Sequence, residues 1–307
     1  MMAKFRTSKV IDLQMPTAAA AASAEEQNQL LDRPIGEILR EKLNLSADQV
    51  EQVLAHMRDH GGRFGDAAVA LGLASQDDVL QALSEQFGYP YADEDRRKLS
   101  PELVALNQPF SAQAEAFRAI RSQIMMRVFS EDQQKRALAI VSPASGDGKT
   151  FFAANLAITL AQAGGRTLLV DADLRGPRQH EVFNLENTAG LSSVLAGRVD
   201  SQVVQQVAGV QNLFVMPVGV TPPNPLELID RPAFNMLIRE LVLKFDHVIV
   251  DTPAVIYGSD ANVIAARCGA VLVVARHNES RVTALQQLVT ALSQSPARLA
   301  GVIMNEF

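Results

Sequence analysis

Strand-length apolar runs recur from residue 137 onward and restrict the fold more than any other feature of the chain. Each run is apolar at successive positions instead of alternating with polar residues, as in strands that are buried on both faces of a sheet. Segments of helical composition separate the runs. This alternation predicts a doubly wound α/β domain with a mainly parallel sheet. The runs are 137–142, 167–171, 212–218, 247–251, 270–275 and 300–305.

A glycine-rich segment follows the first run. Residues 141–150 read VSPASGDGKT and open a helical segment that ends at Gly164 and Gly165. The end of this segment matches the phosphate-binding pattern G-x-x-x-x-G-K-[ST], but Pro143 stands where the pattern has its first glycine. A proline is tolerated there because a strand exit accepts its fixed φ. Small residues let backbone N–H groups surround an anion at a helix N-terminus, so we predict a nucleotide phosphate site.

The residues of this loop have different expected roles. Gly146 and Gly148 let the backbone come closest to phosphate, Lys149 reaches the terminal phosphates, and Thr150 binds Mg²⁺. The alternative is a glycine-rich turn that binds no ligand. The predicted nucleotide-binding set from the loop is Ser145, Gly146, Asp147, Gly148, Lys149 and Thr150.

Two of the apolar runs end in aspartate. Asp171 ends one run, Asp173 follows two residues later, and Asp251 ends another. Ligands of an open parallel sheet bind at the carboxyl ends of its strands, so these carboxylates are expected beside Lys149 and Thr150. One such aspartate is also typical of a turn or a helix cap. Three that converge indicate a site for Mg²⁺ and nucleotide phosphates.

Residues 30–91 contain an internal repeat with a spacing of 29 residues, from Gly36 to Gly65. In each copy a short helix is predicted near the glycine, and a serine, Ser46 or Ser75, then caps a second helix. One helical hairpin cannot bury its apolar face alone. Two stacked hairpins are therefore expected to form a small all-α domain.

The segments around the repeat differ in composition. Residues 1–29 are alanine-rich and of low complexity, which predicts a disordered tail. Residues 92–110 are charged and then punctuated by proline, which is typical of a linker. Apolar residues at helical spacing predict an amphipathic helix over 111–129. We place the nucleotide-binding domain at residues 111–307.

Charge and cysteine content exclude several classes of protein. The formal net charge of −6 argues against general nucleic-acid binding, so no nucleic-acid partner is expected. A single cysteine, Cys268, excludes a disulfide framework and a cysteine-ligated metal within one chain. No apolar run is long enough to cross a membrane, and the N-terminus lacks the apolar core of a secretory signal. We expect a cytoplasmic protein.

Further motifs accompany the phosphate loop and the strand-end aspartates. The pattern Glu115-x-x-Arg118-x-x-Arg121 precedes the first apolar run, and a proline-rich segment, TPPNPLELI, lies at 221–229. Together these motifs resemble the bacterial tyrosine kinases of exopolysaccharide biosynthesis, those associated with chain-length determinants. The resemblance covers residues 111–305. Its stretches are EAFRAIRSQI, SPASGDGKT, LLVDADLRGPRQH, GLSSVLAG, VGVTPPNPLELI and FDHVIVDTPAV.

The resemblance implies a P-loop kinase that transfers phosphate from MgATP to tyrosine. Lys149 and Thr150 would hold ATP and Mg²⁺ in such an enzyme. The implied metal ligands are Thr150, Asp171 and Asp251. Asp171 and Asp173 would also serve hydroxyl activation, which makes Lys149, Asp171 and Asp173 the predicted catalytic residues. Phosphoryl transfer needs positioning and charge neutralisation more than covalent chemistry, which agrees with this set.

The resemblance also implies contacts beyond the phosphates. Asn305, after the last apolar run, is the expected adenine contact. Glu115, Arg118 and Arg121 are expected to join copies of the chain into a homo-oligomeric ring, in which the tail of one subunit enters a neighbour's site. A separate chain-length regulator in the inner membrane is the expected activator. It would recruit the cytoplasmic kinase to the membrane periphery.

The chain departs from the family at its C-terminus. The family carries a C-terminal tyrosine cluster, whereas this sequence ends in GVIMNEF directly after its last apolar run. Its three tyrosines are Tyr89, Tyr91 and Tyr257. Tyr257 follows Asp251 in sequence, and its alternative role is simple packing. The acceptor tyrosine, and whether the chain phosphorylates itself, are left open by the sequence.

Two other functions are compatible with the loop. Partition ATPases of the same superfamily carry an additional lysine early in the loop, and Ala144 occupies that position here. They also lack the proline-rich segment, so the sequence favours the kinase. The other alternative is a scaffold that nucleotide switches between assembly states, with no phosphate reaching a protein.

The helical repeat over 30–91 resembles the N-terminal domain of type II secretion and pilus ATPases. Its second copy, residues 63–86, is similar to the pattern that binds cyclic di-GMP in some of those domains. Arg33 and Arg63 precede the repeat glycines, where a guanidinium can grip phosphate or stack on guanine. The alternative is a helical module that docks a protein. The sequence thus leaves cyclic di-GMP and a protein partner as two hypotheses for this domain.

Overall fold

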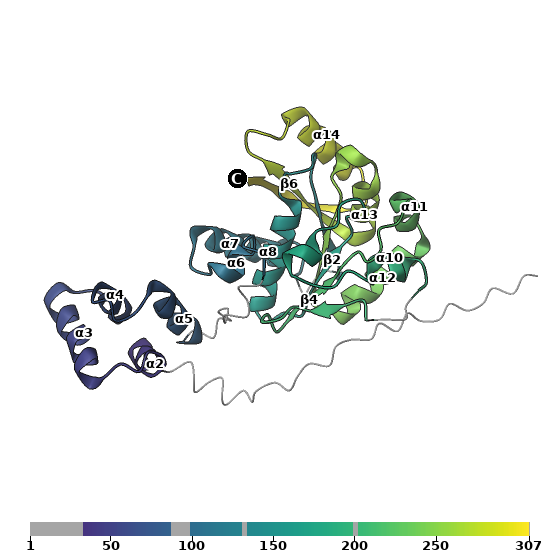
Figure 1. Cartoon of the computed structure of the whole chain (residues 1–307). Helices are drawn as coiled ribbons and strands as arrows, with labels where there is room; N and C mark the ends of the chain where they lie inside the picture. Colours follow the sequence, from purple (N-terminus) through teal and green to yellow (C-terminus); the bar gives the residue numbers. More distant parts are fainter. Residues whose placement is uncertain (1–32, 87–98, 131–133, 199–201, 307) are drawn as a thin grey trace, which may run out of the picture. The chain divides into compact units, whose positions relative to one another are not determined.

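The structure, a computed structural model, consists of two compact units, which we describe separately (Figure 1). One unit is helical, and the other is built around a β-sheet. The tail expected over 1–29 lies outside the described residues. The described residues are 33–86, 99–130, 134–198 and 202–306.

The strands of the larger unit run parallel with one exception. They are β1 (Ala137–Val141), β2 (Thr167–Asp171), β3 (Gln205–Gln206), β4 (Leu213–Met216), β5 (His247–Asp251), β6 (Gly269–Arg276) and β7 (Arg298–Asn305). Over the described residues they form a seven-stranded sheet in the order β3-β4-β2-β5-β1-β6-β7. Only the short β3 is antiparallel to its neighbour β4. The predicted doubly wound, mainly parallel sheet is confirmed, and β3 is an addition to it.

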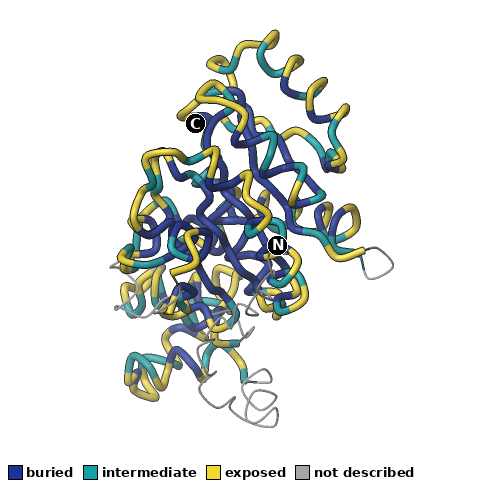
Figure 2. The backbone as a smooth tube through the Cα atoms, turned by 90° about the vertical axis from the view of Figure 1, so that its right-hand side faces the viewer, coloured by how far each residue is buried: buried dark blue, intermediate teal, exposed yellow. Residues whose placement is uncertain are grey.

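Both faces of the sheet are covered by helices, which explains the continuous apolar runs. Leu138 and Ile140 of β1 pack in a cluster with helices on one face, and Ala139 and Val141 pack in a cluster on the other. Figure 2 shows the resulting buried interior of the sheet. The helices are α6 (Val104–Asn107), α7 (Ala112–Arg127), α8 (Lys149–Gln162), α9 (Gln179–Val182), α10 (Leu191–Leu195), α11 (Pro225–Ile229), α12 (Pro232–Lys244), α13 (Asp260–Cys268) and α14 (Val282–Ser293).

The two helical layers differ in membership. Side chains of α6, α7 and α8 form the cluster on one face, whereas α12, α13 and α14 supply much of the other. A 3₁₀-helix, η2 (Val255–Tyr257), follows β5. None of the described helices combines the length and the apolar character needed to span a bilayer. The sheet and α8 position the phosphate loop between them.

Residues 99–107 differ from the expected linker over 92–110. Leu103 and Leu106 are fully buried in the core cluster with α8. The amide of Asn155 on α8 donates to the carbonyl of Glu102 at 2.9 Å, and its oxygen accepts from the backbone N–H of Ala105 at 2.9 Å. This segment is therefore part of the α/β unit, because its apolar residues find a complementary face on α8.

The helical unit follows the predicted repeat. Its helices are α2 (Ile35–Lys42), α3 (Ala47–His60), α4 (Phe64–Ala70) and α5 (Gln76–Gln86). Ser46 caps α3 in a reciprocal capping box with Gln49, and Ser75 exchanges the same pair of bonds with Asp78. Helix α2 packs on α5, and α3 packs on α4. Both predicted caps are confirmed.

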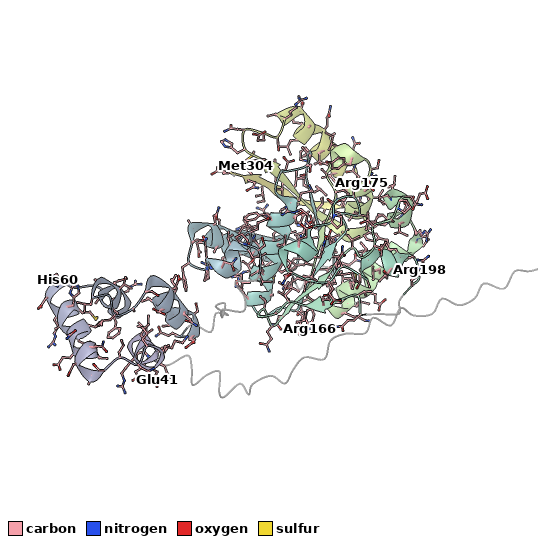
Figure 3. The ribbon with its side chains drawn as sticks, in the orientation of Figure 1. Glu41, His60, Arg166, Arg175, Arg198 and Met304 are labelled. Atoms are coloured by element: carbon pink, nitrogen blue, oxygen red, sulfur yellow. The ribbon has the colours of Figure 1, made fainter. Side chains whose placement is uncertain are left out.

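The arginines of the helical unit lie on its surface. Arg33 forms an ion pair with Glu41 at 2.6 Å (Glu41 is labelled in Figure 3), and Arg63 is exposed at the start of α4. A cavity in this unit, between α2 and α3, is lined by other arginines, Arg40 and Arg58, and by apolar residues of α3. Arg33 and Arg63, the arginines predicted to bind cyclic di-GMP, do not line this cavity, so cyclic di-GMP binding stays a prediction.

Candidate active site

The phosphate loop between β1 and α8 takes the backbone shape that its glycines permit. Gly146 and Gly148 have φ values of +83° and +95°, in the left-handed region that disfavours residues with a Cβ atom. Lys149 begins α8, so the helix N-terminus faces the loop. Pro143 is buried at the strand exit, where its carbonyl accepts from the N–H of Ile256 at 3.2 Å. The missing glycine at position 143 therefore leaves the loop intact.

Asp147 holds the loop from inside. Its carboxylate accepts from the N–H of Ala144 at 2.8 Å and from the hydroxyl of Ser280 at 2.8 Å. The side chain is 2% exposed, so it faces the protein interior. Because the side chain faces inward, Asp147 would contact a nucleotide through its backbone groups. Its role in nucleotide binding stays a prediction. Ser280 has no motif that sequence reasoning recognises, and it was not predicted.

Asn305 lies against the loop although it is distant in sequence. Its amide donates to the carbonyl of Asp147 at 3.1 Å, and a side chain at Gly148 would collide with it. It ends β7, which the sheet places two strands from β1. The structure thus brings Asn305 to the loop, and its contact with adenine stays a prediction.

Asp171 and Asp251 lie side by side at the ends of β2 and β5, where they occupy paired positions. Both are almost completely buried. Burial raises the pKa of Asp171 well above its ordinary value, and the Asp251 carboxylate raises it further. Burial also raises the pKa of Asp251 to about 6, against the lowering effects of Lys149 and of a hydrogen bond from Thr150. The predicted convergence of these carboxylates with Lys149 and Thr150 occurs in the structure.

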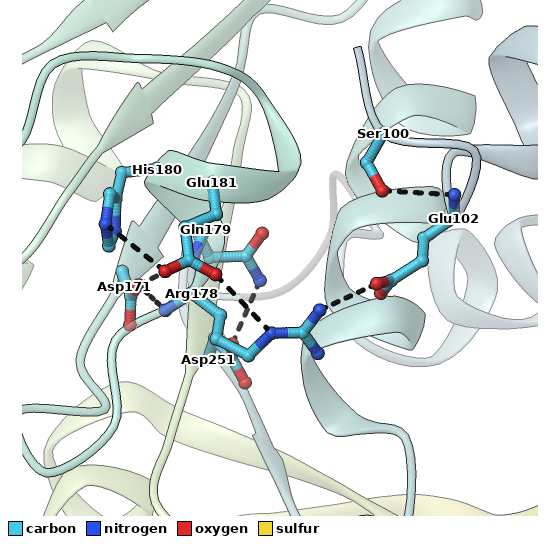
Figure 4. Close-up of polar contacts among 8 residues, drawn as sticks. All are labelled: Ser100, Glu102, Asp171, Arg178, Gln179, His180, Glu181 and Asp251. Carbon is cyan, nitrogen blue, oxygen red and sulfur yellow. Dashed lines mark hydrogen bonds and ion pairs between the residues drawn. The ribbon is translucent and has the colours of Figure 1, made fainter.

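Asp171 organises the loop between β2 and α9. One of its oxygens accepts from the N–H of Asp173 at 3.1 Å, and the other accepts from the N–H groups of Arg178 and Gln179 at 3.1 and 3.0 Å. Figure 4 shows Asp171 together with Arg178 and Gln179. The carboxylate therefore shapes the loop that carries Asp173. The metal and hydroxyl roles predicted for Asp171 stay predictions.

Asp251 has one oxygen available for a ligand. Its Oδ2 atom accepts from the amide of Gln179 at 2.9 Å, whereas the buried Oδ1 atom has no hydrogen-bond partner among the residues that the structure describes. An unpartnered buried carboxylate oxygen is costly unless a cation or a donor meets it. No cluster of three or more metal-ligating His, Cys, Asp or Glu side chains occurs among the described residues. Mg²⁺ in nucleotide sites needs only one or two protein ligands besides phosphate, so Asp251 and Thr150 fit it.

A pocket of about 540 Å³ opens over these groups. Its wall includes the loop and the partly buried Asp173, whose carboxylate accepts from the N–H groups of Arg175 and Gly176 at 3.1 and 3.0 Å. Asp171 and Asp251 do not line it. The residues around the pocket are Pro101, Glu102, Val104, Ser145, Gly146, Gly148, Lys149, Thr150, Phe151, Asp173, Gly176 and Arg178.

Three residues near the pocket were missed from the sequence. Gln179 is fully buried, and its amide joins the carbonyl of Thr150 at 3.2 Å to the carboxylate of Asp251. Arg178 forms an ion pair with Glu102 at 2.6 Å (Figure 4). Arg178 and Gln179 lie in the stretch RGPRQH, whose only signal in the sequence was the family resemblance. Glu102 lies in the segment that was expected to be a linker. No spacing rule connects residues 76 positions apart in sequence.

A second ion pair supports the loop that follows β5. Arg175, labelled in Figure 3, contacts Asp260 at 3.0 Å, and Asp260 is 2% exposed at the start of α13. The pair joins the loop after β2 to the segment after β5. These two loops border the site, so the pair helps to fix their spacing.

The residues expected to join subunits make contacts within the chain. Arg118 pairs with Glu115 at 2.7 Å and donates to the carbonyl of Pro109 at 2.7 Å. Arg121 donates to the carbonyl of Thr159 on α8 at 2.9 Å. The Glu115 side chain is 70% exposed, which leaves it accessible. Their role between subunits stays a prediction.

Tyr257 is the tyrosine that the structure describes, whereas Tyr89 and Tyr91 lie outside the described residues. It closes η2 and is 54% exposed. The exposure leaves both a role in the reaction and simple packing as predictions for Tyr257. The acceptor tyrosine stays open.

The fold and the loop define a class of protein. Residues 138–307 match the family described as the CobQ/CobB/MinD/ParA nucleotide binding domain. This match covers more than half of the chain and includes the phosphate loop, the strand-end aspartates and Asn305. It begins beyond the helical unit, whose resemblance to secretion ATPases stays a prediction.

Individual relatives of this chain within that family are bacterial tyrosine-protein kinases. Tyrosine-protein kinase YwqD of Bacillus subtilis (strain 168) is 36% identical over 209 residues, which cover 68% of this chain and 87% of YwqD. Tyrosine-protein kinase wzc of Salmonella typhi is 30% identical, over 68% of this chain and 29% of wzc. The kinase domain of Escherichia coli tyrosine kinase ETK superimposes with a TM-score of 0.64 at 33% identity, covering 68% of this chain and 81% of that domain. The chain belongs to the CobQ/CobB/MinD/ParA nucleotide-binding family and, within it, to the bacterial tyrosine-protein kinases.

Proposed function

We propose that the chain is an ATP-dependent protein-tyrosine kinase that regulates the chain length or export of an exopolysaccharide. Its relatives support the reaction class. The observation that carries the proposal is the pocket in which the phosphate loop, Lys149 and Thr150 meet Asp173, with the buried Asp251 interacting with Lys149 and Thr150. Phosphoryl transfer requires cations and backbone donors around the phosphates and a carboxylate beside the acceptor, and this pocket combines them.

The loop and Lys149 bind the phosphates of ATP. Backbone N–H groups at Gly146 and Gly148 and the N-terminus of α8 supply partial positive charge, and Lys149 adds a full charge toward the transferred group. Thr150 and Asp251 would hold Mg²⁺. When bound, the metal neutralises charge on the phosphate oxygens. These groups are fixed before the reaction, so little reorganisation is needed at the transition state.

Asp173 orients and deprotonates the tyrosine hydroxyl in this proposal. The hydroxyl oxygen forms a bond to the γ-phosphorus as its proton moves to the Asp173 carboxylate, and the bond to the bridging oxygen of ADP breaks. Asp173 is better placed than Asp171 for this role, because it lines the pocket whereas Asp171 is buried against backbone N–H groups.

Transfer of radiolabelled γ-phosphate tests the proposal. The full chain is incubated with Mg²⁺, labelled ATP and a tyrosine-containing peptide, beside a Lys149→Met variant that lacks the phosphate-binding charge. Phosphotyrosine in the wild type and its loss in the variant are expected. ATP hydrolysis without labelled tyrosine, in the peptide or in the chain, would instead identify a nucleotide-switched scaffold.

We further propose that a separate inner-membrane chain-length regulator activates and recruits the kinase, and that subunits join through Glu115, Arg118 and Arg121. The kinase region forms most of YwqD but 29% of wzc, so related kinase regions occur both nearly alone and within longer chains. A regulator on a separate chain would act on the kinase in trans. Co-purification of this chain with such a regulator tests the first part.

For the helical unit we propose cyclic di-GMP, gripped by Arg33 and Arg63, as the ligand to test. Titration calorimetry on the full chain should detect binding that Arg63→Ala weakens and that Arg58→Ala leaves unchanged. Equal affinities for the two variants, or no heat at high micromolar ligand, would leave this unit as a docking module.

A further inference from the structure

Two opposite charges that line the nucleotide pocket are paired with each other across it. The guanidinium of Arg178 lies 2.6 Å from a carboxylate oxygen of Glu102 (Figure 4). Arg178 immediately precedes α9, and Glu102 lies in the segment that packs on α8. Both residues border the same pocket as Lys149.

The backbone of Arg178 is fixed, and its side chain is not. Its N–H donates to the buried carboxylate of Asp171 at 3.1 Å, and the next residue, Gln179, is tied to Asp251. The side chain is 50% exposed. Rotation of the side chain alone is therefore enough to move the guanidinium within the pocket, with no change in the loop.

Glu102 is held in place opposite. Its carbonyl accepts from the amide of Asn155 at 2.9 Å, and its N–H donates to the hydroxyl of Ser100 at 3.2 Å. Its carboxylate is 36% exposed and adds negative charge to a pocket that otherwise suits phosphates. An anion at this position repels the nucleotide unless its charge is matched, and Arg178 matches it.

We propose that Arg178 is a ligand of the terminal phosphates of the nucleotide and that Glu102 holds it while the pocket is free. A half-exposed ion pair contributes little to stability, so the guanidinium leaves Glu102 at small cost. Phosphate accepts two parallel hydrogen bonds from a guanidinium and carries more charge than one carboxylate. Arg178 thus changes partners when nucleotide binds, and Glu102 lowers the affinity by competing for it.

This inference rests on the proposed function only for nucleotide binding, not for phosphoryl transfer. It predicts that removing the competing charge tightens binding and that removing the guanidinium weakens it. It also predicts selectivity: nucleotides with terminal phosphates gain from Arg178, whereas AMP does not. A purely structural role for the ion pair predicts neither effect.

Titration calorimetry with the full chain and Mg²⁺ tests the inference, with the non-hydrolysable analogue AMP-PNP and with AMP as probes. Glu102→Gln should bind AMP-PNP about threefold to fivefold more tightly than the wild type, as expected for release of one exposed pair. Arg178→Gln should bind it roughly tenfold more weakly, with Arg178→Lys between. The double variant should bind AMP-PNP more weakly than the wild type but somewhat more tightly than Arg178→Gln, because it also lacks the unmatched Glu102 carboxylate. Glu181→Gln is the matched control. Its carboxylate lies 4.0 Å from the same arginine but does not line the pocket, so the affinity for AMP-PNP should be unchanged.

The outcomes separate this inference from the proposed function. Unchanged or weaker AMP-PNP binding by Glu102→Gln, or equal losses for AMP-PNP and AMP in Arg178→Gln, would overturn it while leaving the kinase proposal standing. Absence of AMP-PNP binding by the wild type would overturn both. Thermal unfolding without nucleotide confirms that each variant is folded before its affinity is compared.

Discussion

The protonation of Asp251 is a property of the site that changes with pH. In the folded chain its pKa is raised to about 6 by burial, above the value of an exposed aspartate. A carboxyl whose pKa is raised on folding contributes stability at low pH, and this contribution is lost as the pH rises through its folded pKa. Without nucleotide and metal, the folded state therefore loses stability as Asp251 ionises.

Asp251→Asn should remove this loss. We expect the variant to unfold at a higher temperature than the wild type at pH 7, without nucleotide or Mg²⁺, and the difference to vanish near about pH 4. Circular dichroism at the two pH values measures both melting temperatures. Asp230→Asn, at a carboxylate that is 66% exposed, is the control. An equal difference at both pH values would contradict the assignment.

Asp173→Asn should separate chemistry from binding. If Asp173 takes the proton of the tyrosine hydroxyl, kcat falls roughly 10²- to 10⁴-fold. The affinity for AMP-PNP should stay within about threefold, because the phosphate ligands are unchanged. Peptide phosphorylation and calorimetry give the two quantities. A variant with wild-type kcat would remove Asp173 from the reaction.

At the scale of elements, the patterns that repeat along the chain predicted the structure well. Continuous apolar runs predicted the parallel sheet. The patterns S-x-x-Q and S-x-x-D predicted the N-terminal caps of α3 and α5, because a cap is formed by residues three positions apart. The contacts that close the site are long-range. Asn155 with Glu102, and Ser280 with Asp147, join segments that no spacing relates. The sequence therefore located the loop and the aspartates but not the groups that brace them.

The docking of residues 99–107 depends on one buried amide. Asn155 is fully buried and bonds Ala105, Glu102 and Phe151. Asn155→Ala should lower the free energy of unfolding by about 2–3 kcal/mol, because it leaves buried backbone groups unpaired. Gln162→Ala removes a single contact of 3.3 Å and should cost below about 1 kcal/mol. Urea denaturation followed by circular dichroism compares the two, and equal costs would argue against this anchoring role.

At the scale of the whole molecule, the proposed association of subunits can be tested by substitution. The proposed subunit contacts lie on α7, where Glu115 is largely exposed. The helical unit adds a second surface whose partner is to be identified by binding. Both surfaces lie apart from the phosphate loop in sequence.

Charge reversal at Glu115 tests the assembly. Glu115→Lys should convert the proposed oligomer to monomer, because the lysine repels the arginines that Glu115 is proposed to meet on a neighbour. Light scattering after size-exclusion chromatography measures the mass. Gln113→Lys, on the same helix, adds a lysine elsewhere and should leave the mass unchanged. An unchanged mass for Glu115→Lys would place the interface on another surface.

The fate of the γ-phosphate tests the central claim most directly. In one reaction of the full chain with labelled ATP, Mg²⁺ and the proposed membrane activator, the label is divided between phosphotyrosine and free phosphate. A tyrosine kinase predicts label on tyrosine in the wild type and on neither product with Lys149→Met. Label that appears only as free phosphate, with none on tyrosine, would contradict the account.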